Sequence, residues 1–317
     1  MRIDKSIIFL GMAVAASALL TLFESRINQY YFQILIYIGI NIILASSLNL
    51  INGFAGQFSL GHAGFMAVGA YTAAVITSEI GVARGSIYAI PVFALALIAA
   101  GFVASLFGLI VGIPSLRLKG DYLAITTLGF GEIIRVFVQN LQFLGGARGF
   151  TGIPKLANSF WVFSTAALMI FFIYNLINST YGKAFLAVRD DEIAAEAIGI
   201  SSTRIKVVAF VTGAFFAGMA GGLYGHFVTY INPAQFSFLK SFEIVVMVII
   251  GGMGSIIGVA LSAALLTILP EALRTVSQYR MVIYSLLLII IMITRPQGLF
   301  AGRKSIRREH VPKTETS

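Results

Sequence analysis

The chain has 317 residues, of which 58% are hydrophobic and only 11% are charged. Soluble globular proteins carry about 25% charged residues, so this composition excludes a water-soluble domain and predicts an all-α, polytopic transmembrane bundle. The net charge of +9 does not indicate a nucleic-acid partner, because basic residues in short loops and in the tail are expected on the cytoplasmic side of a membrane protein.

Several kinds of chemistry are also excluded by what the sequence lacks. Cysteine is absent, which rules out disulfides, thiol catalysis and zinc-thiolate sites. The histidines, His62, His226 and His310, are too scattered for a metal-ligand motif. No Gly-x-x-x-x-Gly-Lys-Ser/Thr motif occurs, so the chain is not expected to hydrolyse ATP in a P-loop. We therefore expect no metal, no cofactor and no enzyme activity.

Apolar segments of membrane-spanning length follow one another along the first half of the chain. A transmembrane helix needs about 20 mostly apolar residues. Residues 16–18 read Ala-Ser-Ala, as a signal-peptidase site does, but hydrophobicity continues beyond them, so we interpret the first segment as a retained span. The spans expected here are 6–23, 30–51, 65–77, 87–112, 121–139 and 161–178.

Residues 52–64 are too polar and too rich in glycine for a helix that faces lipid. Irregular backbone at membrane depth persists only where it is buried in protein or lines a water-filled cavity. We interpret this segment as part of a permeation path, with a plain interfacial turn as the alternative. The candidate contacts for the charged ends of a substrate are Asn52, Gln57, Thr126 and Thr127.

The fifth span carries two charged residues, Glu132 and Arg135. Glu132 lies about 17 Å along the helix axis from Asp121, a depth at which an unpaired charge costs about 2.5 to 3.5 kcal/mol. Because Arg135 is three residues further on, the two side chains share a helix face and can neutralise each other. The alternative is a pair that extends to the outer interface.

The largest polar interruption covers residues 179–206 and separates two hydrophobic halves. Acidic residues at its centre favour a helix N-terminus, and Gly199 is suited to end that helix after about eight residues. Glu192 and Glu196 share one face, whereas Ala194, Ala197 and Ile198 form a nearly flat apolar patch on another. We interpret this helix as a docking element, with a solvated connector as the alternative. The residues assigned to it are Arg189, Asp190, Asp191, Glu192, Ala194, Ala195, Glu196 and Gly199.

Glycine shapes the second half of the chain. In the span expected at 207–230, Gly218 and Gly222 form a small-xxx-small pair that favours close helix packing. The apolar segment 242–270 is interrupted by Gly251, Gly252 and Gly254, and short helices broken by glycine often mark a transport pathway. The last span is expected at 280–294.

The distribution of basic residues predicts the topology. Basic residues are more numerous at both termini, in the loop with Arg117 and Lys119 and in the central interruption than in the remaining loops. These segments are therefore assigned to the cytoplasmic side. Lys240 is assigned to an outer loop. This inside-positive arrangement requires the segment 242–270 to cross twice, or to enter and return. The chain then has about eight to ten spans, with spans two to five running opposite to spans seven to ten, as in an inverted repeat.

These landmarks together resemble the LivM-type permeases of bacterial branched-chain amino acid ABC importers. Residues 117–135 resemble the best-known block of this family, and residues 49–64, 251–258 and 295–299 fit it as well. The central interruption resembles the coupling loop of ABC importer permeases, with Ala194, Ala195 and Gly199 at the matching positions of a Glu-Ala-Ala-x-x-x-Gly pattern. Ile193 occupies the position of its glutamate, and the acid has moved to Glu192.

The resemblance implies a transport subunit of the inner membrane that works with other chains. These partners are a second, related permease, two cytoplasmic ATPases and an extracytoplasmic binding protein. Urea or another small polar solute is the alternative substrate, because urea permeases look much alike. An ion-coupled secondary transporter is the rival class, for which only Glu132, Glu243 and Asp121 offer carboxylates. The expected divisions are 1–29, a transport domain at 30–299 with a coupling loop at 179–206, and a cytoplasmic tail at 300–317.

Overall fold

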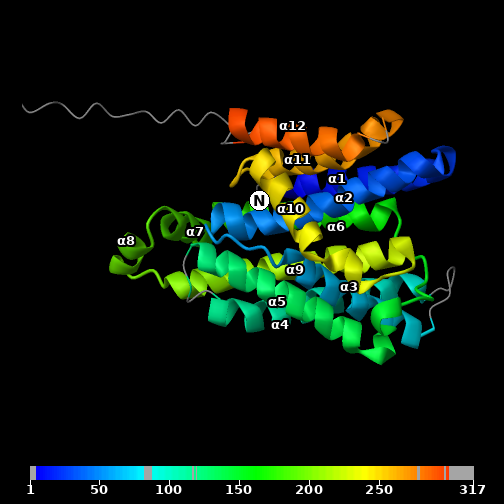
Figure 1. The fold of residues 1–317 in the computed structure, drawn as a ribbon, viewed down its shortest axis with the longest axis horizontal. Coiled ribbons are helices and arrows are strands. Elements are labelled where there is room, and N and C mark those ends of the chain that lie inside the picture. Colours follow the sequence, from blue (N-terminus) through cyan, green and yellow to red (C-terminus); the bar gives the residue numbers. More distant parts are fainter. Residues whose placement is uncertain are drawn as a thin grey trace, which may run out of the picture.

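The computed structural model describes residues 5–81, 88–115, 118, 120–276, 279–295 and 298–299. Arg84, Arg117, Lys119 and the tail at 300–317 lie outside the described residues. The described chain is a bundle of helices whose one β-bridge joins Phe150 to Ile231, which confirms the predicted all-α fold (Figure 1). The helices are α1 (Lys5–Phe23), α2 (Gln29–Asn49), α3 (His62–Glu79), α4 (Ala89–Ser115), α5 (Asp121–Asn140), α6 (Ser159–Asn178), α7 (Thr180–Asp190), α8 (Glu192–Ala197), α9 (Ser202–Val228), α10 (Phe238–Gly251), α11 (Ile256–Ala272) and α12 (Arg280–Thr294).

The bundle has the apolar helices of a multi-pass membrane protein. Within the described residues, five helical stretches are long and apolar enough to cross a membrane, and two shorter apolar helices, Leu10–Phe23 and Ile256–Ala272, accompany them. The total of eight to ten crossings therefore stays a prediction. The five stretches are Gln29–Phe54, Ala89–Ser115, Ser159–Asn178, Ser202–Val228 and Pro233–Gly251.

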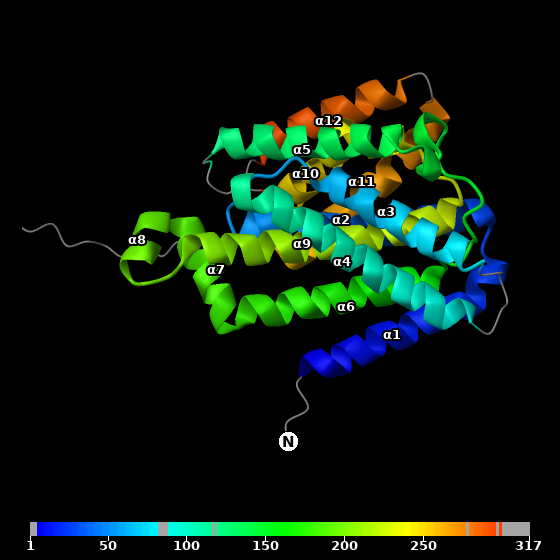
Figure 2. The ribbon, with the colours of Figure 1, turned by 90° about the horizontal axis from the view of Figure 1, so that it is seen from below.

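The long helices run between two ends of the bundle. Helices α7 and α8 project from one end, which we call the loop end (Figure 2). Phe32, near the start of α2, lies against Phe227, near the finish of α9, with ring centroids 6.2 Å apart. These two helices are therefore antiparallel, and we call the end where α2 begins and α9 finishes the far end.

Each half of the chain enters the bundle through an irregular segment. After α2 reaches the loop end, residues 55–61 return to the middle of the bundle, where α3 begins. After α9 reaches the far end, residues 229–237, which include a short 3-10 helix at Pro233–Phe236, return to the middle, where α10 begins. The two starts are neighbours, because the Ala63 N–H donates a hydrogen bond to Ser241 Oγ at 3.0 Å. The order of helix, irregular segment and three further helices thus occurs twice with opposite direction, as predicted for an inverted repeat.

The glycine-rich interruption of the second half has a different place from that of the first. Gly252 and Gly254 adopt positive φ angles of 93° and 84° and reverse the chain at the loop end. A Cβ atom at Gly251 would lie 2.5 Å from the Cα of Val259, so α10 and α11 form a close hairpin there. The counterpart of residues 52–64 is therefore the segment 229–237, which the sequence analysis assigned to an outer loop and not to a segment that returns into the bundle.

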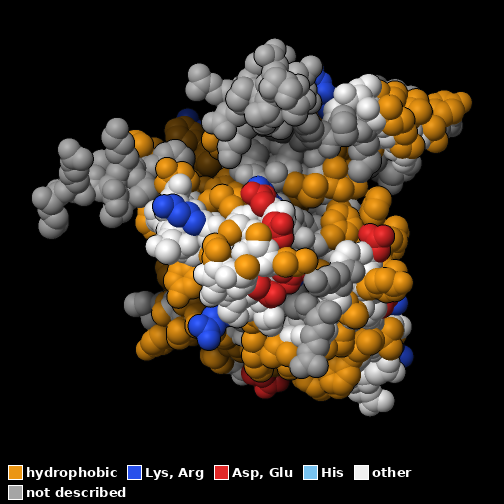
Figure 3. Space-filling model, turned by 90° about the vertical axis from the view of Figure 1, so that its left-hand side faces the viewer, with side chains coloured by type: hydrophobic (Ala, Val, Ile, Leu, Met, Phe, Trp, Pro, Cys, Tyr) orange, Lys and Arg blue, Asp and Glu red, His pale blue; other side chains and the backbone are white. Residues whose placement is uncertain are grey.

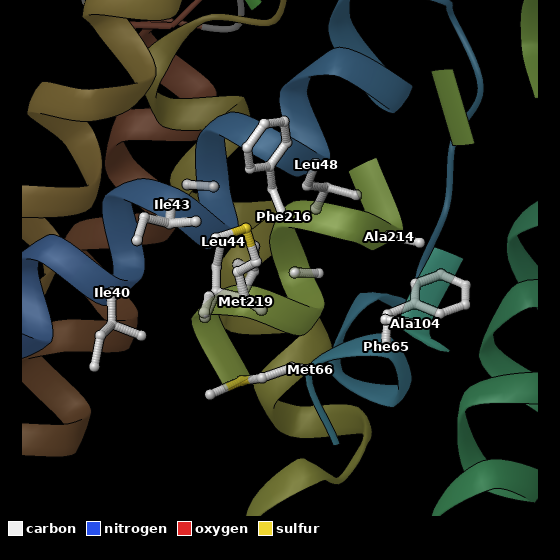
Figure 4. Packing of buried hydrophobic residues seen from close by; sticks show 14 of the residues in the cluster. Ile40, Ile43, Leu44, Leu48, Phe65, Met66, Ala104, Ala214, Phe216 and Met219 are labelled. Carbon is white, nitrogen blue, oxygen red and sulfur yellow. The ribbon is translucent and has the colours of Figure 1, made fainter. Parts of the chain in front are cut away.

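Helix α9 is the centre of the packing. Its small residues let α3 and α4 approach it, and Figure 4 shows Ala214, Phe216 and Met219 of α9 among apolar side chains from neighbouring helices. Gly218 fits between α4 and α3, with Gly69 of α3 in backbone contact. Close approach of this kind is how membrane helices gain van der Waals contact when lipid supplies no hydrophobic driving force between them.

Replacing Gly218 by alanine should destabilise the bundle. The new Cβ atom would lie 2.5 Å from Ala104 Cβ and 2.6 Å from the carbonyl oxygen of Ala100, so α9 would have to move away from α4. Overpacking of this kind costs about 1 to 3 kcal/mol, and we expect a lower midpoint of thermal unfolding in detergent. Gly129→Ala in α5 is the matched control, because no atom lies within 4 Å of a Cβ there. Equal losses in both variants would contradict the packing argument.

Candidate functional site

The helices α7 and α8 form the projection at the loop end. The sequence predicted one helix opened by three acidic residues, and this was wrong in detail. Asp190 is the last residue of α7, and Asp191 is the N-cap of a six-residue α8. The Oδ1 atom of Asp191 accepts hydrogen bonds from the N–H groups of Ile193 and Ala194, each at 3.0 Å. The chain therefore turns sharply between the helices because the Asp191 side chain stabilises the new start.

Gly199 ends α8 as expected. Its φ angle is +86°, a left-handed conformation that glycine adopts without steric cost. The Gly199 N–H donates to the Glu196 carbonyl and the Ile200 N–H donates to the Ala195 carbonyl, both at 3.0 Å. This is the hydrogen-bond pattern of a Schellman cap.

The three residues of the predicted apolar patch, Ala194, Ala197 and Ile198, are exposed on α8. Glu192 pairs with Lys206 at 2.7 Å, and Glu196 accepts a hydrogen bond from Ser202, so both acids hold α8 against α9. Ile193 and Ile198 are each 76% exposed. Two large apolar side chains therefore stand out from the projection, and Figure 3 shows hydrophobic and acidic side chains gathered at this end.

Arg189 joins the projection to the bundle. Its Nη1 atom donates to the carbonyl oxygen of Gly53, just beyond α2, at 3.3 Å. The same Nη1 lies 3.4 Å from where a Cβ atom of Gly254 would stand, in the turn between α10 and α11. Asp190 accepts from the other guanidinium nitrogens at 3.0 and 2.8 Å. One side chain therefore contacts the loop-end turns of both halves.

Asn49, at the end of α2, binds the turn between α10 and α11 from within the bundle, a role that the sequence did not predict. Its Oδ1 accepts from the Gly254 N–H at 2.8 Å, and its Nδ2 donates to the Ser255 carbonyl at 3.3 Å. The signal available in the sequence was a primary amide in an otherwise apolar helix. Such a group needs a partner when it is buried, but the sequence does not show which one.

The four residues expected along a permeation path hold the backbone of the first irregular segment or lie close to it. Asn52 accepts a hydrogen bond from the Ser59 N–H at 3.1 Å, and Gln57 donates to its near neighbour, the Ala55 carbonyl. Thr127 accepts from the Leu60 N–H at 3.0 Å. Asn52, Gln57 and Thr127 are buried, whereas Thr126 is half-buried. Contact with substrate stays a prediction for all four.

The pair expected in the fifth span is present and has a second function. Arg135 Nε lies 2.6 Å from Glu132 Oε2. The other carboxylate oxygen of Glu132 accepts from the Phe238 N–H at 2.9 Å. Glu132 therefore satisfies an N–H group that the first turn of α10 leaves without a partner inside its own helix. This contact between the halves was not predicted.

Lys240 does not lie in an outer loop, as the sequence analysis assumed. It belongs to the first turn of α10 in the middle of the bundle, because residues 229–237 bring the chain back there before the helix starts. Its Nζ atom lies 3.0 Å from Glu243 Oε2 and 3.3 Å from Asn41 Oδ1. A second charged pair therefore lies at mid-bundle, on α10.

This architecture defines a multi-pass membrane transport subunit. Irregular segments enter an apolar bundle from both ends, polar groups meet at mid-bundle, and a helical projection stands at one end. Within the described residues, no group of three or more His, Asp or Glu side chains could hold a metal ion.

The chain belongs to the family described as the permease component of the branched-chain amino acid transport system, whose model matches residues 30–294. It is 37% identical over 295 residues to the high-affinity permease protein LivM of Salmonella typhimurium, which covers 82% of this chain and 67% of the relative. It is 27% identical over 325 residues to a probable LivM of Methanocaldococcus jannaschii, covering 86% and 94%. It is also 26% identical over 300 residues to LivH of Escherichia coli, covering 84% and 92%. No solved structure matches the chain.

Neutralising Glu132 and Arg135 should give strongly non-additive effects. In Glu132→Gln the amide oxygen can still accept from Phe238, so the change isolates the charge pair, and Arg135→Gln removes the partner. Residues in contact show coupling energies of about 0.5 to 3 kcal/mol, and we expect the double variant to be more stable than the sum of the single losses indicates. Thermal unfolding in detergent measures this. Additive losses would show that the pair contributes nothing.

Proposed function

We propose that this chain is a translocation subunit of an ATP-driven importer of branched-chain amino acids in the bacterial inner membrane. Support comes from the family match and from relatives named as permeases for this substrate class. Residues 30–299 would form the transport domain. Hydrolysis of ATP would belong to separate subunits, because the sequence contains no P-loop.

The proposed assembly has this chain beside a second, related permease, in a heterodimer. Relatives of two kinds, LivM and LivH, both match this sequence, so a chain of the LivH kind is the proposed neighbour. Two cytoplasmic ATPases and an extracytoplasmic binding protein would complete the transporter. The loop end and both termini would face the cytoplasm. Helix α12 finishes at the loop end (Figure 1). Helix α1 runs in the opposite direction, because Thr21 near its end contacts Ser159 at the far end.

The observation that carries the mechanism is the contact of Arg189 with both loop-end turns. A motor that presses on α8 moves α7, and Arg189 transmits this motion to the turns at Gly53 and Gly254. The first turn leads into the irregular segment before α3, and the second turn joins α10 to α11. The two helix starts at mid-bundle would then shift relative to each other. A cycle of this kind requires the motor to contact the two states differently.

The docking energy would come chiefly from the two exposed isoleucines of α8. Full burial of such a side chain contributes about 1.5 to 3 kcal/mol. Glu192 and Glu196 already bind within this chain, so they fix the orientation of α8 while Ile193 and Ile198 make the contact. An apolar groove on the ATPase is the matching surface.

Introducing a charge at Ile198 should weaken ATPase binding. The carboxylate of Ile198→Asp would have to be desolvated in an apolar groove, so we expect at least about tenfold less ATPase to co-purify, which corresponds to about 1.4 kcal/mol. Ile80→Asp is the matched control, because Ile80 is 60% exposed at the far end. Undiminished ATPase recovery with Ile198→Asp would contradict docking through α8.

Replacing Arg189 by methionine should uncouple hydrolysis from transport. The complete transporter is reconstituted in vesicles, and leucine uptake per ATP hydrolysed is measured. A hydrogen bond to a charged group contributes about 1.5 to 3 kcal/mol, so we expect uptake per ATP to fall about tenfold or more. Lys183→Met is the control, because Lys183 is an exposed cation of α7. If the unmodified transporter shows no ATP-dependent leucine uptake, the proposed function is wrong. Unchanged uptake with Arg189→Met would refute the transmission role alone.

A further inference from the structure

The mid-bundle start of α10 leaves a recess towards the far end. A cavity of about 340 Å³ lies there between α2, α3, α9, α10 and α11. Sites for small molecules usually have about 300 to 1,000 Å³, so the cavity has the size of a site for one small solute. Its polar lining consists of Tyr37, Asn41, Tyr224, Lys240, Glu243 and Thr267.

Both signs of charge line this recess. Lys240 and Glu243 form an ion pair with side chains 21% and 39% exposed, so a small molecule can reach both. Asn41 accepts from Lys240 and donates from its Nδ2 to Thr267 Oγ1 at 2.9 Å. Charged residues within a membrane bundle are costly, and they are typically found along substrate pathways.

Two further cavities lie next to the recess towards the far end. A cavity of about 180 Å³ shares Tyr37 and Thr267 with the recess. A third cavity of about 690 Å³ shares Tyr30, Ile34 and Glu271 with the second. Neighbouring cavities therefore line α2 and α11 from the far end to the ion pair.

We propose that the recess binds the zwitterionic backbone of an amino acid, with the ammonium group at Glu243 and the carboxylate at Lys240. This inference rests on the proposed function and assigns a substrate site to it. The zwitterion would enter between the two residues and replace one ion pair by two, so the net charge of the recess stays zero. Apolar walls from Ile40, Met66 and Leu266 would receive the aliphatic side chain.

This exchange also keeps binding weak. The ammonium group of the substrate competes with Lys240 for Glu243, and the carboxylate competes with Glu243 for Lys240. A pathway must bind its solute weakly enough to release it. A neutral solute such as urea can hydrogen-bond to these groups but forms neither ion pair, so the recess distinguishes amino acids from urea by charge.

Variants of the pair separate a substrate role from a structural one. Lys240→Met and Glu243→Gln are each measured in the reconstituted transporter, together with the double variant Lys240→Met with Glu243→Met. If the pair only supports the fold, removing both charges should restore uptake, because a buried pair can often be replaced by apolar residues. If it binds substrate, all three variants should lose leucine uptake about tenfold or more. Lys155→Met and Glu79→Gln are the matched controls and should keep uptake. Recovery in the double variant would overturn the proposal.

Thiol protection tests occupancy directly, because the chain contains no cysteine. Thr267→Cys places a thiol at the recess, and Thr151→Cys places one in an exposed loop as the control. In the full transporter without ATP, saturating leucine should slow the modification of Thr267→Cys by a methanethiosulfonate reagent several-fold, and urea should not. Modification is read from the mass of this chain. Equal rates with and without leucine, in a transporter whose wild-type form imports leucine, would overturn this site and leave the proposed function intact.

Discussion

Every backbone polar group within the bundle needs a partner, and this constraint governs the structure. No water is available in lipid, so chain that is not helical at membrane depth must find its hydrogen bonds within the protein. Two irregular segments enter the bundle, and side chains satisfy the N–H groups where each ends. Thr127 accepts from Leu60, Ser241 accepts from Ala63, and Glu132 accepts from Phe238.

The same groups create the conditions for transport. Because α3 and α10 both begin at mid-bundle, two helix N-termini and the Lys240 pair lie at one depth, far from either end. Helix starts carry a partial positive charge and unsatisfied N–H groups. The loop-end turns below them meet at Arg189 and Asn49. Arg189 thus connects the projection to the turn at Gly53, from which residues 54–61 lead to the mid-bundle start of α3.

The sequence predicted what depends on local pattern. Apolar runs, the glycine cap at Gly199 and the pairing of Glu132 with Arg135 all follow from residues close together in the chain. The second irregular segment was predicted only as an outer loop. Its return to mid-bundle was missed, because residues 229–237 contain no run of glycines and this path depends on partners from α5 and α3. Lys240 was misplaced for the same reason, since only the contact with Asn41, far away in sequence, shows its depth.

The reciprocal bonding between the halves has a consequence for biogenesis. When the first half leaves the ribosome, the start of α3 still lacks Ser241, and Glu132 still lacks the backbone amide of Phe238. The early helices therefore enter the bilayer with a half-finished interior, which closes only after α10 has been synthesised. Each half therefore supplies a hydrogen-bond acceptor that a helix start of the other half needs, and both starts are satisfied only when the two halves are together.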